Sequence, residues 1–204
     1  MYQTRFLKIT GDHAQTFLQG QLTCDVQQTP CLGAHCNIKG RVLFSFMLTY
    51  RDNAYWMKLP SSMLSIAKKR LEKFAVFSHV AVEETPLYET GGILTDKKSE
   101  IEQGLVTIYP ETSGLFTPHE LNYPKFNIVH FKKGCYTGQE VIARMEYLGK
   151  LKTKLFSMLI SNPTEHHCLG APVYNGSQEE IGLLADYVTD KNKLILLVVG
   201  ANKN

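Results

Sequence analysis

The sequence predicts an α+β fold in which antiparallel sheets pack against helices, followed by a small C-terminal antiparallel β-barrel-like unit. In the N-terminal part, short segments of alternating hydrophobicity are separated by tight-turn residues and interrupted by amphipathic helical segments. Beyond Gly149 the pattern changes to strands alone. We therefore expect an α+β domain at residues 1–149, with a shortened middle region at about 85–118, and a small β domain at residues 150–204.

The N-terminal part is predicted to alternate hairpins with helices. Its strands are expected at Arg5–Ile9, Ala34–Asn37, Val42–Tyr50, Ala54–Leu59 and His79–Glu83. Asp12 is expected to cap a first helix whose buried stripe includes Phe17 and Leu18. A second helix opens at Pro60 and places apolar residues at a/d spacing, namely Leu64, Ala67, Leu71 and Phe74.

The rest of the chain is predicted from its helix breakers and its apolar periodicity. Between Thr85 and Pro118, repeated Pro and Gly residues indicate loops and short strands. After Gly138, one helical face collects the apolar residues Val141, Ile142, Met145 and Leu148. The C-terminal strands are expected at Leu151–Ile160, Val173–Tyr174, Ile181–Tyr187 and Leu194–Val199, with a hairpin turn at 190–192.

The composition is typical of an ordinary globular protein. Of the 204 residues, 44% are hydrophobic and 20% are charged, and a formal net charge of +3 is too small to indicate nucleic-acid binding by itself. No apolar run is long enough to span a membrane, and the N-terminus lacks the apolar segment of a signal peptide. We therefore expect a cytoplasmic protein with no membrane partner and with mostly reduced cysteines.

The most informative motif is the segment from Lys133 to Glu140, which reads KGCYTGQE. Cys135 follows two lysines and precedes a helix, so the cations and the helix dipole are expected to favour its thiolate. Gly134 and Gly138 permit a sharp turn or a close approach of the backbone. The motif indicates either a reactive cysteine or a glycine-rich turn with an incidental thiol.

Together with further segments earlier in the chain, this motif resembles the YgfZ-type folate-binding proteins, relatives of the glycine cleavage T-protein. The segment Phe17–Val26 reads FLQGQLTCDV, and Ala34–Val42 carries a Lys-Gly-Arg turn. Ile101–Gly104 and Phe116–Asn122 then precede the cysteine in the family's order. The resemblance covers nearly the whole chain.

The resemblance implies an aminomethyltransferase folate-binding-like fold and tetrahydrofolate or a derivative as cofactor, with no tightly bound metal. Glu102 matches the glutamate that contacts the pterin in the T-protein relatives. Lys39 and Arg41 are the candidate cations for binding the glutamate tail of the folate. Cys135 is the functional thiol. The other cofactor-binding residues that the resemblance implies are Asn122, Lys133, Gly134, Gly138, Gln139 and Glu140.

The chain departs from the family pattern in two respects. It is shorter than typical bacterial members, with the missing material between Glu84 and Ile101 and in the C-terminal barrel. The aminomethyltransferase relatives also use an aspartate just after the hairpin turn, where this chain has Phe44 and Ser45. Neither side chain is a carboxylate that acts as an acid or base at neutral pH, so glycine-cleavage chemistry is not expected.

The function implied by the resemblance is that of a folate-binding accessory protein for iron–sulfur cluster assembly or repair and, through it, tRNA modification. Its expected partners are iron–sulfur assembly proteins or client iron–sulfur enzymes. Three roles stay open for Cys135: transient ligation of iron or sulfur, thiol redox chemistry, and local packing. His130 is the nearest candidate base in the sequence.

Three alternatives accompany this hypothesis. The first is a folate-dependent one-carbon (aminomethyl) transferase. The second is a nucleic-acid-binding module using Lys68, Lys69, Arg70 and Lys73, but these residues interleave with Leu71 and Glu72 as on a solvated helix face, so direct binding is not expected. The third is a zinc site, although the spacing contains no C-x2-C pair among Cys24, Cys31, His35, Cys36, His166, His167 and Cys168.

Overall fold

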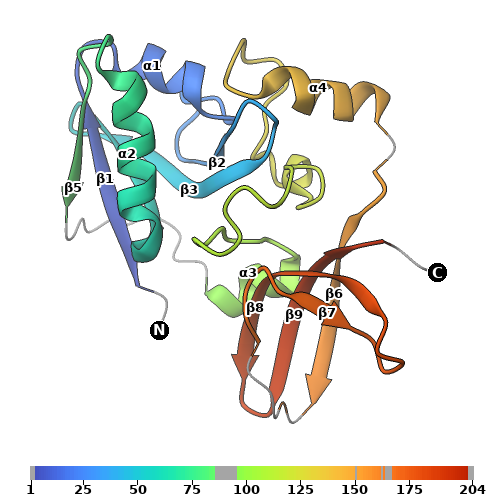
Figure 1. Ribbon diagram of the computed structural model, residues 1–204. Coiled ribbons are helices and arrows are strands. Elements are labelled where there is room, and N and C mark those ends of the chain that lie inside the picture. Colours follow the sequence, from blue (N-terminus) through green and yellow to red (C-terminus); the bar gives the residue numbers. More distant parts are fainter. Residues whose placement is uncertain (1–2, 86–95, 150, 162, 164–166, 202–204) are drawn as a thin grey trace.

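Two antiparallel sheets, connected by a long central segment, make up the molecule (Figure 1). The structure, a computed structural model, describes residues 3–85, 96–149, 151–161, 163 and 167–201. The first sheet has the order β2-β3-β4-β1-β5 and consists of β1 (Thr4–Thr10), β2 (Cys31–Cys36), β3 (Val42–Arg51), β4 (Ala54–Pro60) and β5 (Ala81–Thr85). The second has the order β6-β9-β8-β7 and consists of β6 (Lys154–Ser161), β7 (Pro172–Tyr174), β8 (Glu180–Asp190) and β9 (Lys193–Gly200).

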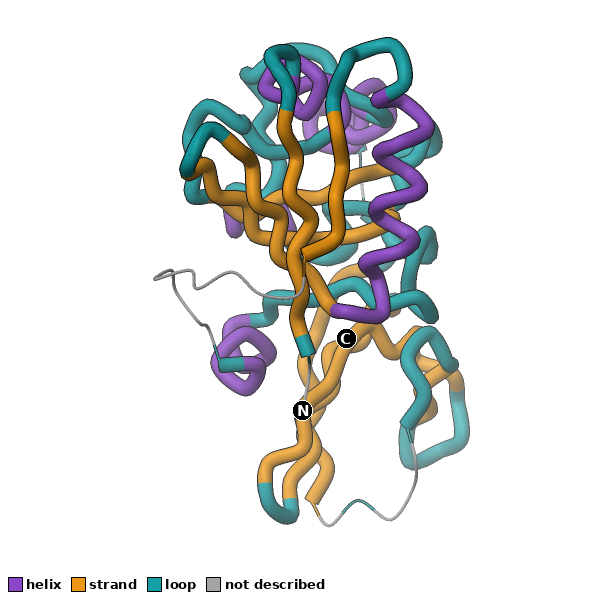
Figure 2. Tube along the Cα trace, turned by 90° about the vertical axis from the view of Figure 1, so that its left-hand side faces the viewer, coloured by secondary structure: helices purple, strands orange, loops and turns teal. Residues whose placement is uncertain are grey.

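The alternation along β3 shows how the first sheet divides its two faces. Phe44, Phe46 and Leu48 are buried, whereas Ser45 and Met47 between them are only partly buried. The buried face packs against α1 (Ala14–Gln21) and α2 (Leu64–Ala75), whose apolar stripes join the same core. Figure 2 shows the long helix lying along the strands on this side. The opposite face is left for the rest of the chain to cover.

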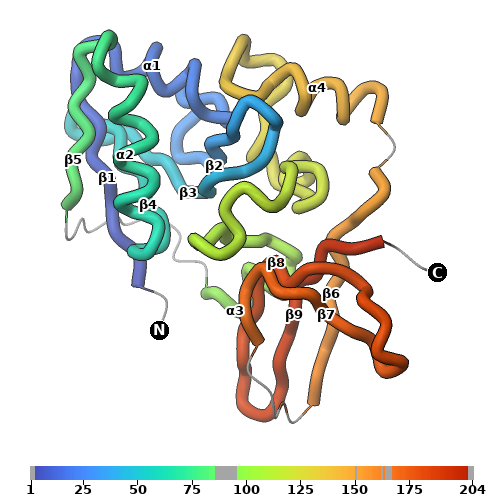
Figure 3. Tube along the Cα trace, viewed as in Figure 1, coloured from blue at the N-terminus to red at the C-terminus, as the bar shows by residue number. Residues whose placement is uncertain are grey.

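The segment between α3 (Lys97–Gln103) and α4 (Gln139–Leu148) covers that second face and lies between the two sheets (Figure 3). Its backbone is anchored on β3, because Val42 N donates to Phe116 O at 2.8 Å and Gly114 N donates to Val42 O at 2.7 Å. A short 3-10 turn, η2 (Tyr123–Phe126), follows, and α3 itself packs against β8 and β9. The central segment therefore couples both sheets.

The predicted fold class is confirmed, with three local corrections. The stretch expected to hold only loops and short strands contains α3, which buries the single apolar residue Ile101 and ends at Gly104 with φ +80°. Asp12 does not cap α1, whose N-cap residue is His13 without a side-chain cap. β5 begins at Ala81 because His79 has φ +50° and interrupts the extended backbone.

Parts of the predicted domain division lie outside the described residues. These parts are residues 86–95 of the shortened middle region and Lys150 at the predicted boundary. Among the described helices, none has the length and hydrophobicity needed to cross a membrane.

The buried His35 on β2 gives the folded state a defined response to acid. Its Nδ1 donates to Gln21 O at 2.8 Å, its Nε2 accepts from Arg70 Nε at 3.4 Å, and its ring stacks on Phe44 at 5.1 Å between centroids. Burial lowers the pKa of His35 from 6.5 to about 4, with Arg70 adding to the effect. The folded state therefore holds this imidazole neutral.

We predict that the free energy of unfolding decreases as the pH falls from 6.5 toward 4, because the unfolded chain then binds a proton that folded His35 does not. The His35 contribution is about 1.4 kcal/mol per pH unit, or about 3 kcal/mol in total. Urea unfolding of the wild type and of His35→Phe at several pH values measures it. Equal pH slopes for the two proteins over this range would contradict the assignment.

Candidate functional site

A cavity of about 450 Å³ lies on the partly buried face of the first sheet. Its floor comes from β3 and β4, with Ser45, Met47 and Lys58. Its walls come from α3, with Lys97 and Glu100, and from residues 105–109. This volume and the mixture of apolar walls with a few charged groups are typical of a small-molecule site.

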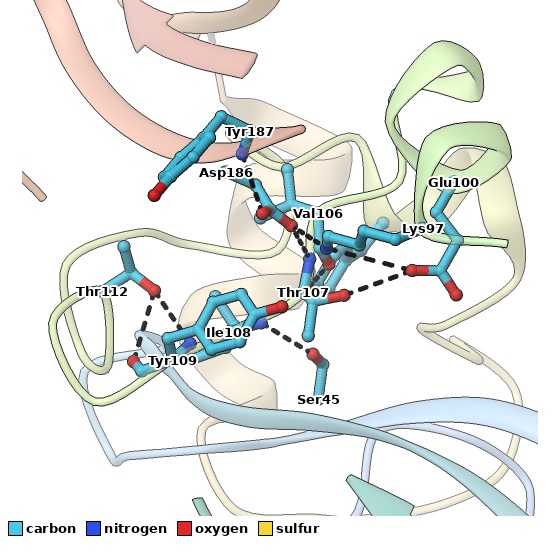
Figure 4. Close-up of polar contacts among 11 residues, drawn as sticks. Ser45, Lys97, Glu100, Val106, Thr107, Ile108, Tyr109, Thr112, Asp186 and Tyr187 are labelled. Atoms are coloured by element: carbon cyan, nitrogen blue, oxygen red, sulfur yellow. Dashed lines mark hydrogen bonds and ion pairs between the residues drawn. The ribbon is translucent and has the colours of Figure 1, made fainter. Parts of the chain in front are cut away.

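A buried ion pair holds the wall of the cavity in place (Figure 4). The Lys97 ammonium contacts Oδ2 of Asp186. Asp186 lies on β8 and is fully buried. Two backbone groups complete the shell of this carboxylate: Thr107 N donates at 2.7 Å and Tyr187 N at 2.8 Å. Burial raises the pKa of Asp186, while Lys97 acts in the opposite direction. The Asp186 carboxylate on β8 thus binds both α3, through Lys97, and the segment after α3, through the backbone of Thr107.

Two carboxylates line the cavity, Asp96 and Glu100, and Glu100 is the partly buried one. Its Oε2 lies 3.9 Å from Lys97 Nζ and accepts from Thr107 Oγ1 at 3.5 Å. The Lys97 ammonium also lies 5.4 Å from the centre of the Tyr109 ring, which lines the same cavity. On the floor, Ser45 Oγ accepts from Ile108 N at 3.1 Å. Charged and aromatic side chains from α3 and residues 105–109 therefore converge on one wall of the cavity.

Glu102, the predicted pterin-binding residue, does not line this cavity. Its side chain is exposed and lies 3.9 Å from Lys98 on the outer face of α3. Positions 100 and 102 of a helix point about 200° apart, so only one of the two can face the sheet. Glu100 is the one of the two that lines the cavity. The motif alone did not indicate this because α3 was not predicted.

The predicted cations for the folate tail also lie elsewhere. Arg41 donates through Nη1 to Leu115 O and forms an ion pair with Glu120 at 3.2 Å. Lys39 is exposed on the hairpin turn. Neither residue lines the cavity, whose lysines are Lys58 and Lys97.

The cysteine motif packs against the hairpin turn between β2 and β3. Gly138 has φ +85°, and a Cβ at this position would lie 2.5 Å from Asn37 O, so the turn and the motif approach more closely than a side chain allows. α4 begins directly after it, at Gln139. Gly134 has φ +96° and open space around it, and the adjacent Cys135 is exposed.

Lys133 of the motif points inward and binds the N-terminal segment. Its ammonium donates to Gln19 O and, at 2.7 Å, to Leu22 O, and it lies 5.0 Å from the centre of the Tyr136 ring. Gln19 Nε2 donates in return to Lys133 O at 3.3 Å. Burial lowers the pKa of Lys133 to about 8. Two motifs that are distant in the sequence therefore form one packed unit.

The remaining predicted binding residues lie on the surface of this unit. Glu140 pairs with Arg144 at 3.2 Å on exposed helix surface, and Gln139 is partly buried at the start of α4. Asn122 is exposed with φ +57° at the start of η2. None of them lines the cavity, and α4 lies well apart from α3 (Figure 1). The predicted site thus divides into a cavity near α3 and an exposed thiol near α4.

The zinc alternative finds no support in the described part of the chain. Within it, no group of three or more His, Cys, Asp or Glu side chains is arranged to hold a metal ion. Cys36 is buried, which raises the pKa of its thiol, and Cys168 is exposed. His166 lies outside the described residues.

The arrangement of the two sheets and the helices matches the fold of a solved glycine cleavage aminomethyltransferase. The chain is similar to the crystal structure of the glycine cleavage system aminomethyltransferase T from Bartonella henselae, with a TM-score of 0.71 over 97% of this chain and 76% of that chain. The sequence identity is 12%, so this similarity concerns the fold.

Two relatives named "tRNA-modifying protein YgfZ" match most of the sequence. The protein from Colwellia psychrerythraea is 27% identical, covering 96% of this chain and 82% of the relative. The protein from Photobacterium profundum is 26% identical, covering 96% and 80%. No family model matches the chain. The resemblance to YgfZ-type proteins that the motifs predict is confirmed by these relatives.

The two ion pairs between α3 and β8 allow a controlled test of the cavity wall. We predict that Asp186→Ala lowers the free energy of unfolding by about 3 kcal/mol, because it removes the fully buried carboxylate that accepts from the Lys97 ammonium and from two backbone N–H groups. Asp190→Ala removes an exposed partner of Lys98 in the same two elements and is expected to change stability little. Urea unfolding of both variants measures the difference, and equal losses would contradict the wall assignment.

Proposed function

We propose that this chain binds a reduced folate in the cavity and serves as an accessory factor for iron–sulfur cluster assembly or repair, through which it supports tRNA modification. The fold shared with an aminomethyltransferase and the similarity to proteins named for tRNA modification support this proposal. The single observation that carries it is the cavity with a carboxylate, Glu100, on its wall.

The chemistry of the cavity fits a folate. The aminopyrimidine ring of a pterin presents adjacent N–H donors, which a carboxylate such as Glu100 can accept. The walls offer apolar and aromatic surface from Met47, Leu105 and Tyr109 for a flat ring. Lys58 provides a cation for the acidic tail. Glu100, Lys58 and these walls are therefore the residues proposed to hold the ligand.

The residues around Ser45 favour binding over one-carbon transfer. Ser45 lines the cavity at one of the two positions that correspond to the catalytic aspartate of the aminomethyltransferase relatives, and the other, Phe44, is buried on the opposite face of β3. The Ser45 hydroxyl accepts from Ile108 N and does not titrate near neutral pH. We propose that the bound folate is held here without glycine-cleavage chemistry.

The basic side chains of α2 support an indirect role in tRNA modification. Arg70 donates to the buried His35 ring, and Lys68 lies 3.9 Å from Glu72. Two of the four cations considered for nucleic-acid binding thus have partners within the protein. Direct nucleic-acid binding is not part of the proposal.

The exposure of Cys135 suits contact with another protein. A single thiolate cannot hold an iron–sulfur cluster, so the proposal requires ligands from a partner, either an assembly protein or a client enzyme. Cys135 lies in a loop between two glycines of positive φ, Gly134 and Gly138, and is not among the residues that line the cavity. We propose that this thiol acts at the partner interface while the folate site lies apart from it.

Folate binding is tested by a matched pair of variants on α3. We predict that folinic acid, a stable reduced folate, binds the full chain and that Glu100→Gln weakens binding about tenfold or more, because an amide accepts and donates where the pterin needs an acceptor. Glu102→Gln changes the same residue type on the exposed face and is expected to leave the affinity unchanged. Isothermal titration calorimetry measures both. If only Glu102→Gln lost affinity for folinic acid, Glu102 would be the pterin-binding residue and the cavity site would be refuted.

The role of Cys135 is tested in cells that lack their own YgfZ-type factor. We predict that Cys135→Ala fails to restore the activity of iron–sulfur-dependent tRNA-modifying enzymes, whereas Cys168→Ala, which removes another exposed thiol, restores it fully. Mass spectrometry of modified nucleosides provides the readout, with protein levels compared by immunoblot. Full complementation by Cys135→Ala would remove the thiol from the proposal.

A further inference from the structure

Two further thiols, Cys24 and Cys31, lie together at β2 of the first sheet, next to Gly33. Cys31 begins β2 and shares a face with Gly33, which pairs with Phe46. The Cys24 sulfur lies over Gly33, only 2.5 Å from where a Cβ at that position would be. Because Gly33 has no side chain, the Cys24 sulfur can lie against the strand there, close to Cys31.

The chain between these cysteines is a closed loop. Thr23 N donates to Ala34 O at 2.9 Å, and Ala34 N donates to Thr23 Oγ1 at the same distance, so the two arms are joined beside Cys24. The Cys31 sulfur lies 3.9 Å from Asp25 O. Both thiols are free. The backbone therefore holds the pair together without any covalent link.

The two thiols differ in their surroundings. Cys24 is buried, whereas Cys31 is partly exposed. A hydrogen bond from the Cys24 thiol lowers the pKa of Cys31, and the same bond, together with burial, raises the pKa of Cys24. The Lys133 ammonium, held on Leu22 O, favours the thiolate form of both residues. The more accessible sulfur is thus the better nucleophile.

We propose that Cys24 and Cys31 form a dithiol site that exchanges with low-molecular-weight disulfides such as glutathione disulfide. The Cys31 thiolate attacks one sulfur of glutathione disulfide, forms a mixed disulfide and releases one glutathione thiolate. The Cys24 sulfur then attacks the Cys31 sulfur, its proton passes to the departing thiolate, and a second glutathione leaves. One glutathione disulfide is reduced to two glutathiones, and the dithiol is oxidised to one disulfide.

This site is separate from the function proposed for Cys135. Lys133 connects the Cys24–Cys31 pair to the Cys135 loop. Its side chain lies on the carbonyls of Gln19 and Leu22 near the pair, and its backbone begins the loop that carries Cys135. Oxidation of the pair replaces a thiolate near the Lys133 ammonium with a neutral disulfide. Oxidation of the Cys24–Cys31 pair therefore changes the charge environment of Lys133, which belongs to the cysteine motif.

A redox titration of the unmodified full chain tests the proposal. The protein is equilibrated with mixtures of glutathione and glutathione disulfide, quenched in acid, alkylated and cleaved before aspartate, which separates Cys24 from Asp25 and Cys31. We expect the two resulting peptides to become disulfide-linked as the share of glutathione disulfide increases. Alkylation of Cys24 in every mixture, or linkage of Cys31 to a different cysteine, would overturn the proposal.

A pair of lysine variants tests the electrostatic part. Lys133→Met is expected to slow the alkylation of Cys31 by iodoacetamide several-fold, because it removes the cation that favours the thiolate. Lys132→Met removes the neighbouring exposed lysine and is expected to leave the rate unchanged. Circular dichroism establishes that both variants are folded. Equal rates in folded wild type and Lys133→Met would remove Lys133 from the site.

Discussion

The ion pair between Lys97 and Asp186 is the interaction on which the cavity depends. Asp186 is fully buried in the second sheet and receives the Lys97 ammonium and two backbone N–H groups. Charges that are buried this completely require partners, so α3 and the backbone at Thr107 are held to β8. Because Ile108 is bonded to Ser45 on β3, the same connection reaches the first sheet. One wall of the cavity is thus connected by hydrogen bonds and an ion pair to both sheets.

The sequence predicted the strands well because their signals are local. Alternation and turn residues indicated β1, β3, β4 and the last hairpin close to their observed bounds. α3 was missed because its sequence, KKSEIEQ, contains one apolar residue, Ile101, and shows no helical periodicity. Because α3 was not predicted, the sequence also did not indicate that Glu100 lines the cavity, since that depends on which face of a helix each glutamate occupies.

The site residues were harder to predict than the family. The motifs identified similar proteins, but a motif does not state which of its side chains face a ligand and which hold the motif together. Lys133 illustrates the difference: its position next to Cys135 suggested an activating cation, whereas its ammonium binds the carbonyls of Gln19 and Leu22. The contact spans more than a hundred positions of sequence, which only the folded chain reveals. The hydrogen bonds between Lys133 and Gln19 pack the two motifs against each other.

The central claim is that the cavity beside Glu100 holds a reduced folate. A crystal structure of the full chain grown with folinic acid tests it most directly. We expect the crystal structure to show the pterin bound in the cavity. Its N–H donors should lie within hydrogen-bonding distance of the Glu100 carboxylate, and its acidic tail should point toward Lys58. Folinic acid bound against Glu102 or beside Cys135, with the cavity free of it, would contradict the account.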